Sequence, residues 1–352
     1  MPGPSPRKSF LNNRVPLYWL VLVIVGCGVS LFFAFRKPKV IVESKPGDCV
    51  SFMKQIRLNR FNLIHPLLLT DLEVEDSRLQ TLKHRVEELI EARKQNHAIT
   101  SASVYVRSLN DGGWFAINPE ETYIPASLQK VGIMMSYLKE VEHNPALLDY
   151  KIKFESHFSN LPKQNIKDFS LEEHQFYTVK DLLHYMIAFS DNDALNLLYK
   201  NMNNTTYNNL YTDIGLEVPN LERDDYTVSV KNFARFFRML YSATYLSNDL
   251  SEMGLELLAQ STYRNGICRN LDPKIVVAHK FGERAYGVEK QLHEFAIVYA
   301  NNQPYLLGIM TKGNDNIPLS DVLSEISDLV YTGMLPLAYV SAGSGNKVSR
   351  YN

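Results

Sequence analysis

An uninterrupted apolar run fills residues 17–35 and follows a Pro-rich, basic segment at residues 1–16. The run contains no charged residue, and about 20 such residues suffice to cross the hydrocarbon core of a bilayer. The pattern therefore predicts one transmembrane helix. Residues 24–27 also resemble a bacterial lipoprotein cleavage box, but the apolar run continues beyond them, which favours an uncleaved anchor. Basic residues flank the run on both sides, so charge does not settle its orientation.

Two further segments frame the main part of the chain. Residues 36–75 form a connection of mixed character, in which Phe61–Leu69 is too apolar for a free linker. We expect this stretch to pack on the domain that follows, because exposed apolar surface is unfavourable in water. At the other end, residues 336–352 are expected to be a flexible tail, because the chain becomes rich in glycine and serine from Val340 onward.

Alternating and helical hydrophobic patterns between residues 76 and 335 predict strands at both ends of one domain and helices in its middle. The predicted strands span residues 102–107, 114–117, 274–280, 294–299 and 305–310. The predicted helices span residues 78–95, 179–187, 228–241 and 320–329, with two more beginning near residues 131 and 193. Asn110-Asp111-Gly112-Gly113 favours a hairpin between the first two strands.

This order of elements predicts an α+β fold. One antiparallel five-stranded sheet can be built from both ends of the domain and flanked by the terminal helices, with the middle helices as an all-helical lobe. In such an arrangement, the apolar faces of the sheet and of the helices pack against one another. A cleft between the sheet and the lobe is the place where a ligand site is expected.

The composition excludes some classes of function. The net charge is −1 and no basic run occurs beyond the N-terminal region, so we expect no nucleic-acid partner. Cys27, Cys49 and Cys268 lack the spacing of a metal site, and we predict neither a metal nor a cofactor. Cys49 and Cys268 could pair outside the cytoplasm, but their spacing does not show that they meet, and the sequence favours two separate thiols.

Candidate chemistry begins at Ser127-Leu128-Gln129-Lys130, which leads from a turn into a helical pattern. The backbone N–H of a serine in the first helical turn lies at the positive end of the helix dipole. A lysine three residues later lies on the same face, where it can act as base for a serine nucleophile. The pattern alone is weak, since Ser5 and Ser51 also begin S-x-x-K sequences, and a plain helix cap with a solvated lysine explains it equally well.

Two partner motifs follow in the expected contexts. Ser190-Asp191-Asn192 falls at the junction of two predicted helices, and Lys280-Phe281-Gly282 ends the first late strand. Singly, these would be a helix cap and a strand end. Together and in this order, they resemble the S-x-x-K, S-D-N and K-T-G set of penicillin-recognising serine hydrolases, and the class A β-lactamase branch most closely. The resemblance covers roughly residues 76–335.

The resemblance implies a role for each motif residue. Ser127 would attack a carbonyl to form an acyl-enzyme, and Lys130 would take its proton. Ser190 would bridge Lys130 and Lys280 and pass a proton to the leaving nitrogen.

Substrate recognition is implied for the remaining positions. Asn192 would hold a substrate amide, and Lys280 would steer a carboxylate. The oxyanion hole would consist of the backbone N–H groups of Ser127 and of Glu283, the residue after Gly282.

Two departures from the family pattern affect the expected activity. Phe281 replaces the usual Thr or Ser, which removes a hydroxyl that would bind a substrate carboxylate. The interval from Ser190 to Lys280 is 90 positions (280 − 190), which is short for the family. In class A β-lactamases this interval carries a loop whose glutamate activates the deacylating water. Here, neither Glu217 nor Glu222 matches that pattern.

We therefore predict a membrane-anchored serine hydrolase with its catalytic domain outside the cytoplasmic membrane. Its substrate would be a β-lactam or a D-amino-acid cell-wall peptide. One alternative is a cell-wall D,D-carboxypeptidase or transpeptidase. Another, of a different class, is a sensor domain that binds a β-lactam or peptidoglycan without turnover.

Overall fold

A computed structural model of the chain describes residues 53–158, 169–220, 223, 225–300 and 302–344. The predicted basic segment, the transmembrane run at residues 17–35 and Cys49 lie outside these residues. Within the described part, no helix is both long enough and apolar enough to span a bilayer.

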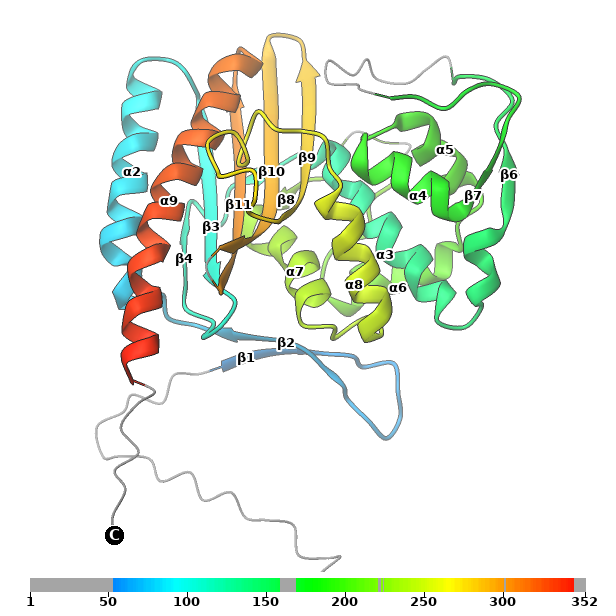
Figure 1. Cartoon of the computed structure of the whole chain (residues 1–352), viewed down its shortest axis with the longest axis horizontal. Coiled ribbons are helices and arrows are strands. Elements are labelled where there is room, and N and C mark those ends of the chain that lie inside the picture. The colour runs from blue at the N-terminus through cyan, green and yellow to red at the C-terminus, as the bar shows by residue number, and fades with distance from the viewer. Residues whose placement is uncertain (1–52, 159–168, 221–222, 224, 301, 345–352) are drawn as a thin grey trace, which may run out of the picture. The chain divides into compact units, whose positions relative to one another are not determined.

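A five-stranded antiparallel sheet is the centre of the structure (Figure 1), as the sequence predicted. Its spatial order is β4-β3-β11-β10-β9. The strands are β3 (Ser101–Ser108), β4 (Trp114–Ile117), β9 (Val277–Tyr286), β10 (Glu289–Ala300) and β11 (Gln303–Gly313). The first two strands therefore pair with the last three, and the sheet joins both ends of the domain.

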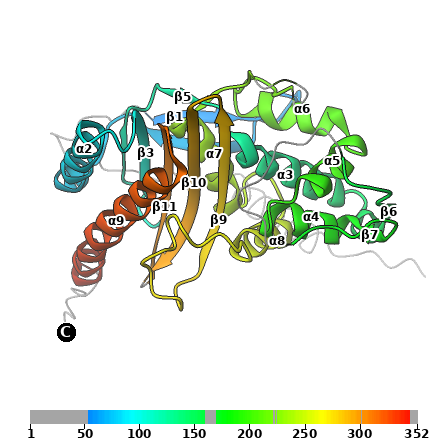
Figure 2. The ribbon, with the colours of Figure 1, turned by 90° about the horizontal axis from the view of Figure 1, so that it is seen from above.

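Each face of the sheet has its own apolar core. Helices α2 (Gln80–Gln95) and α9 (Asn316–Ser344) cover one face, where Val104 and Ala296 pack with Val86 and Ile326. The other face packs on α7 (Val230–Tyr241) and the helical lobe through residues such as Phe295. Figure 2 shows the two sets of helices on opposite sides of the strands. The alternation of side chains along each strand sends neighbouring residues into different cores.

The helical lobe comes from the middle of the domain. It contains η2 (Ala126–Gln129), α3 (Lys130–Val141), η3 (Pro145–Asp149), α4 (Val179–Ala188), α5 (Asn192–Lys200), α6 (Asn204–Asp213) and α8 (Asn248–Ala259). Short strand pairs brace it: β5 (Thr122–Tyr123) with β8 (Val228–Ser229), and β6 (Lys151–Lys153) with β7 (Phe176–Thr178). Thr178 caps α4 in a reciprocal capping box with Asp181, which fixes where that helix begins.

The segment before the domain forms a hairpin of β1 (Met53–Arg57) and β2 (Leu67–Leu72), and a short η1 turn (Ser77–Leu79) leads into α2. The expected packing of the apolar stretch Phe61–Leu69 holds only for its last two residues. Leu68 and Leu69 are buried in the core beside α7, whereas Leu63 is 95% exposed.

Several predicted boundaries were wrong. The first late strand begins at Val277 and continues to Tyr286, because it pairs with β10 over its whole length, so Lys280 lies inside the strand. The last helix, predicted over residues 320–329, runs from Asn316 to Ser344 and so continues past residue 336, where the tail was expected to begin. The helix predicted from residue 228 begins at Val230, because Ser229 caps it and pairs in β8.

Candidate active site

Ser127 lies in the short η2 turn that leads directly into α3. Ser127 is half-buried. The preceding residue, Ala126, has a φ of 50°, which is unusual for a residue other than glycine. Strained backbone of this kind is typical of functional sites, where the surrounding structure maintains it.

Gly282 allows β9 to lie against this turn. A Cβ atom at Gly282 would come within 2.6 Å of the Pro125 carbonyl oxygen and 3.1 Å of the Leu128 nitrogen. A larger residue would therefore push the strand away from η2. The close approach brings the backbone around Gly282 and Glu283 to the Ser127 turn, as the implied oxyanion hole requires.

Lys130 is the first residue of α3, and its side chain is 1% exposed. Its Nζ atom donates to the Ser190 carbonyl oxygen at 2.5 Å, to Ser190 Oγ at 3.1 Å and to Asn192 Oδ1 at 2.7 Å. Within the described residues, no hydrogen bond joins Lys130 to the Ser127 hydroxyl. Catalytic hydrogen bonds are often long in unliganded sites and shorten when substrate binds.

Ser190 occupies the tight junction between α4 and α5. Asp191 caps α5 through a 2.7 Å bond from the Ala194 N–H to its Oδ1 atom, so the two helices almost abut. Ser190 bridges them with a φ of 56°, a left-handed conformation that costs a non-glycine residue about 1–2 kcal/mol. This geometry directs both its carbonyl and its hydroxyl toward the lysines.

Lys280 reaches the same hydroxyl from the sheet. It is fully buried, and its Nζ atom donates to Ser190 Oγ at 2.9 Å and to the Phe281 carbonyl oxygen at 3.0 Å. The Ser190 hydroxyl therefore accepts from Lys130 and Lys280 at once. Three elements far apart in the sequence thus form one continuous hydrogen-bonded chain.

Burial lowers the pKa values of both lysines, Lys130 and Lys280. It lowers the pKa of Lys130 to about 7, because the charged form loses its hydration, while the nearby carboxylates of Asp191 and Glu283 act in the opposite direction. Burial also lowers the pKa of Lys280 well below its ordinary value, and the charge of Lys130 lowers it further. Lys130 can therefore be neutral near physiological pH, as a general base must be.

Phe281 stands where the family usually has Thr or Ser, and its side chain lies in the apolar core instead of offering a hydroxyl to a substrate. Its ring is 3% exposed and stacks on Tyr263 at 4.3 Å between centroids, in the core beneath α9. The Lys280 Nζ atom lies 4.3 Å from the centroid of the same ring. No motif or periodicity pointed to Tyr263, which belongs to the loop before β9.

Among the residues that the structure describes in the loop after Leu216, no glutamate is placed as a counterpart of the deacylating glutamate of class A enzymes. Glu217 is exposed, and Glu222 lies outside the described residues. The carboxylates that influence Lys130 are those of Asp191 and Glu283. Glu283, which the resemblance assigned a backbone role, thus also contributes a negative charge near both lysines.

One buried group of side chains has the composition of a metal site. Cys268, His279 and Glu294 lie together, with 3.6 Å between Cys268 Sγ and His279 Nε2. However, Glu294 already uses one oxygen on His279 Nδ1 at 2.7 Å and the other on the Ile267 N–H at 2.7 Å. We interpret the group as a buried hydrogen-bond cluster that holds the loop before β9 on the sheet. Cys268 is a free, buried thiol, and burial raises its pKa to about 12.

In this fold, Lys130 and Lys280 both bond to Ser190, beside the turn that carries Ser127. This arrangement defines the class of β-lactamases and penicillin-binding proteins. A model of the β-lactamase enzyme family matches residues 81–334. The chain therefore belongs to that family. A comparison with curated proteins gives no significant match.

Solved structures with the same fold include three relatives of low identity. A mutant of PBP-A in an acyl-enzyme complex with penicillin G has a TM-score of 0.62 at 20% identity, covering 73% of this chain and 97% of that one. The TLA-1 extended spectrum β-lactamase has a TM-score of 0.63 at 15% identity, covering 74% and 100%. A β-lactamase from Chitinophaga pinensis DSM 2588 has a TM-score of 0.61 at 18% identity, covering 72% and 98%.

The pKa of Lys130 predicts how acylation depends on pH. The resemblance implies that the neutral amine of Lys130 accepts the Ser127 proton, and the neutral fraction rises as pH rises through about 7. The rate constant for penicillin acylation should therefore increase with pH, with an inflection near 7, when followed by rapid-quench mass spectrometry. In Glu283→Gln, a carboxylate that favours the charged ammonium is lost, so the inflection should move to lower pH. A rate that stays constant or falls across neutral pH would contradict the role of Lys130.

Proposed function

We propose that the chain is a membrane-anchored serine hydrolase that forms an acyl-enzyme at Ser127 with a β-lactam or a D-amino-acid cell-wall peptide. The observation that carries the proposal is the buried chain Lys130–Ser190–Lys280 beside the Ser127 turn. If Ser127 were only a helix cap, nothing would require two buried lysines that both bond to the Ser190 hydroxyl, because burying a lysine amino group costs free energy of hydration. The acyl-enzyme complex of the PBP-A mutant with penicillin G supports the choice of substrate class.

Acylation follows from this arrangement. Neutral Lys130 takes the proton of the Ser127 hydroxyl as the oxygen attacks the carbonyl carbon, and the carbonyl π electrons move to the oxygen. Backbone N–H groups of Ser127 and Glu283 stabilise that oxyanion, and one such donor is typically worth about 3–4 kcal/mol. When the tetrahedral intermediate collapses, Ser190 gives its proton to the leaving nitrogen and regains one from Lys130. The lysine is then neutral again, and the acyl group remains on Ser127.

Lys280 has a positioning role in this scheme. Its amino group is fully buried and donates to the Ser190 hydroxyl at 2.9 Å. In its protonated form it can also attract a substrate carboxylate, as the resemblance implies. Phe281 offers no hydroxyl to share that contact, and the charge of Glu283 opposes it. We therefore propose weaker selection for acidic substrates than in relatives with the usual Thr or Ser.

A cell-wall D,D-peptidase or a non-turnover sensor is the second candidate. The observation that favours it is the lack of a recognisable deacylating glutamate among the described residues of the loop after Leu216. One experiment separates these functions: incubate the protein with penicillin and, separately, with a D-Ala-D-Ala peptide. The adduct is followed by intact mass, and D-alanine is quantified. D-alanine release without β-lactam turnover would identify the peptidase, and a permanent adduct without either product would identify the sensor.

Slow deacylation is the expected kinetic signature. General-base assistance to water is typically worth about 10²–10⁴-fold, and the loop that supplies it in class A enzymes is short here. A chromogenic cephalosporin should therefore give a burst of one product per active site, followed by a slow steady state, in stopped-flow absorbance. Rapid turnover without a burst would refute this expectation. Loss of such turnover in Glu217→Gln or Glu222→Gln would then identify the base.

We also propose that the catalytic domain lies outside the cytoplasmic membrane, held by the apolar run at residues 17–35. The support is the length of that run and the location of the proposed cell-wall substrates. Protease added to intact spheroplasts should remove the domain from residue 40 onward, as detected with an antibody to the domain. Protection that persists until the membrane is permeabilised would indicate the opposite orientation.

A further inference from the structure

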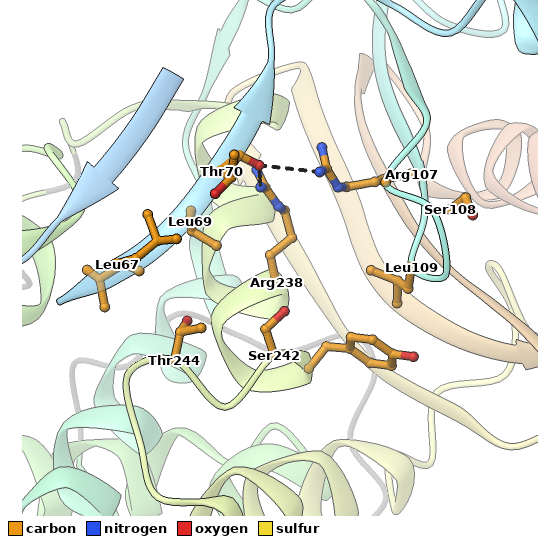
Figure 3. Close-up of a pocket in the computed structure, with 12 residues that line it drawn as sticks. Leu67, Leu69, Thr70, Arg107, Ser108, Leu109, Arg238, Ser242 and Thr244 are labelled. Atoms are coloured by element: carbon orange, nitrogen blue, oxygen red, sulfur yellow. Dashed lines mark hydrogen bonds between the residues drawn. The ribbon is translucent and has the colours of Figure 1, made fainter. Parts of the chain in front are cut away.

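A cavity lies outside the Ser127 site, and none of its lining residues belongs to η2, α3, the α4–α5 junction or β9. It has a volume of about 260 Å³ and is bounded by β2, the end of β3 with the turn that follows, and the C-terminal end of α7 (Figure 3). Its walls combine two buried arginines with leucines and hydroxyl groups. The function proposed above does not use any of these residues.

The polar end of the cavity is formed by Arg107 from β3 and Arg238 from α7, which are 9% and 6% exposed. Both compete for the same two acceptors in β2. Arg238 holds them closely: Nη1 is 2.5 Å from Asp71 Oδ1 and Nη2 is 2.8 Å from the Thr70 carbonyl oxygen. For Arg107 the corresponding distances are 3.8 Å and 3.4 Å. Figure 3 shows the two guanidinium groups converging on Thr70.

Arg107 is therefore short of acceptors. A guanidinium has five N–H donors, and among the described residues the Nη1 atom of Arg107 has no hydrogen-bond partner. Two buried guanidinium groups also face one carboxylate, Asp71, which leaves an excess positive charge. Arg235, on the same helix as Arg238, adds to it. An uncompensated buried charge is costly, and an anion in the cavity would relieve that cost.

The other residues that line the cavity indicate which kind of molecule would carry the anionic group. Leu67 and Leu69 of β2 line one side of the cavity, Leu109 lines the opposite side, and Tyr241 is also in the lining (Figure 3). Such a surface suits an aliphatic body better than a bare inorganic ion, because it gains from apolar contact and cannot solvate charge. Thr244 adds a buried hydroxyl that has no hydrogen-bond partner within the described part of the chain.

We propose that this cavity binds a small organic carboxylate with an aliphatic body. The carboxylate would accept hydrogen bonds from Arg107, in the planar geometry that guanidinium groups favour, and supply the missing negative charge. The aliphatic part would lie against the three leucines. The site is independent of Ser127 chemistry, so its occupant need be neither substrate nor product.

The test uses the purified full-length chain in detergent and hexanoate as the probe, with binding measured by isothermal titration calorimetry. Hexan-1-ol has the same body without the charge, and inorganic phosphate has the charge without the body. Hexanoate should bind at least about tenfold more tightly than either. Equal binding of hexanoate and hexan-1-ol would overturn the role of the arginines. Equal binding of phosphate would overturn the role of the leucines, and no binding of hexanoate would leave water as the occupant and overturn the proposal.

A pair of variants locates the site. Arg107→Gln should weaken hexanoate binding about tenfold or more, whereas Arg93→Gln, a matched change at an arginine paired with Glu325 outside the cavity, should not. Arg107→Lys keeps the charge and should retain part of the affinity if Arg107→Gln misfolds. Penicillin acylation should be unchanged in all three. Undiminished hexanoate binding in a folded Arg107→Gln protein would refute the assignment.

Discussion

Replacing Ser127 with alanine should abolish the covalent penicillin adduct while leaving the protein folded. No other group in the proposed site can form the ester, because Lys130 and the Ser190 hydroxyl are buried and bonded to each other. The change removes a single oxygen from a half-buried residue, so the free energy of unfolding should shift by about 1 kcal/mol or less. Intact mass spectrometry after incubation with penicillin measures the adduct, and thermal unfolding measures the stability.

The chain supplies its own controls for this experiment. Ser5 and Ser51 begin two of the other S-x-x-K sequences in the chain, and Ser136 and Ser344 begin two more. Ser5→Ala and Ser51→Ala should therefore retain full labelling, and peptide mapping of the wild-type adduct should place it on the tryptic peptide that contains Ser127. An adduct that persists in Ser127→Ala, or that maps to either of the other serines, would show that the nucleophile has been misassigned.

Replacing Lys130 with methionine should slow acylation by about 10²–10⁴-fold, the usual contribution of a general base. Methionine has nearly the length of the lysine side chain without its amine, so it can occupy the same buried space. It cannot bond to Ser190 and Asn192, which loses three hydrogen bonds as well as the proton acceptor. Rapid-quench mass spectrometry gives the acylation rate constant, and the pH inflection near 7 should disappear.

Lys139 provides the matched control on the same helix. Its ammonium bonds to Glu142 and to the Tyr245 carbonyl oxygen, away from the site. Lys139→Met should cost some stability but leave the acylation rate constant and its pH dependence intact. If Lys130→Met and Lys139→Met slowed acylation equally, the effect would come from helix α3 as a whole, and Lys130 would not be the base.

The fold could be predicted in outline because its signals are local. Strand and helix periodicity in residues 76–335 predicted the five strands and the helical middle, including the helix at residues 179–187 that the structure shows as α4. Strand ends were less predictable. The length of β9 depends on its pairing with β10, which continues past Gly282 to Tyr286, and such pairing is not encoded in the residues of one strand.

The candidate site was predictable as a set of residues but not as a chemical environment. The sequence determined that Ser127 and Lys130 share a helical turn and that two further motifs follow in family order. The tertiary structure alone decided that Ser190 accepts from lysines 60 and 90 positions away. It also decided that burial lowers the pKa of Lys130 to about 7, and that Phe281 packs on Tyr263. The arginine-lined cavity is likewise a product of three distant elements, β2, β3 and α7. Periodicity and motif order are properties of neighbouring residues, whereas hydration, charge and shape depend on which distant segments exclude water from one another.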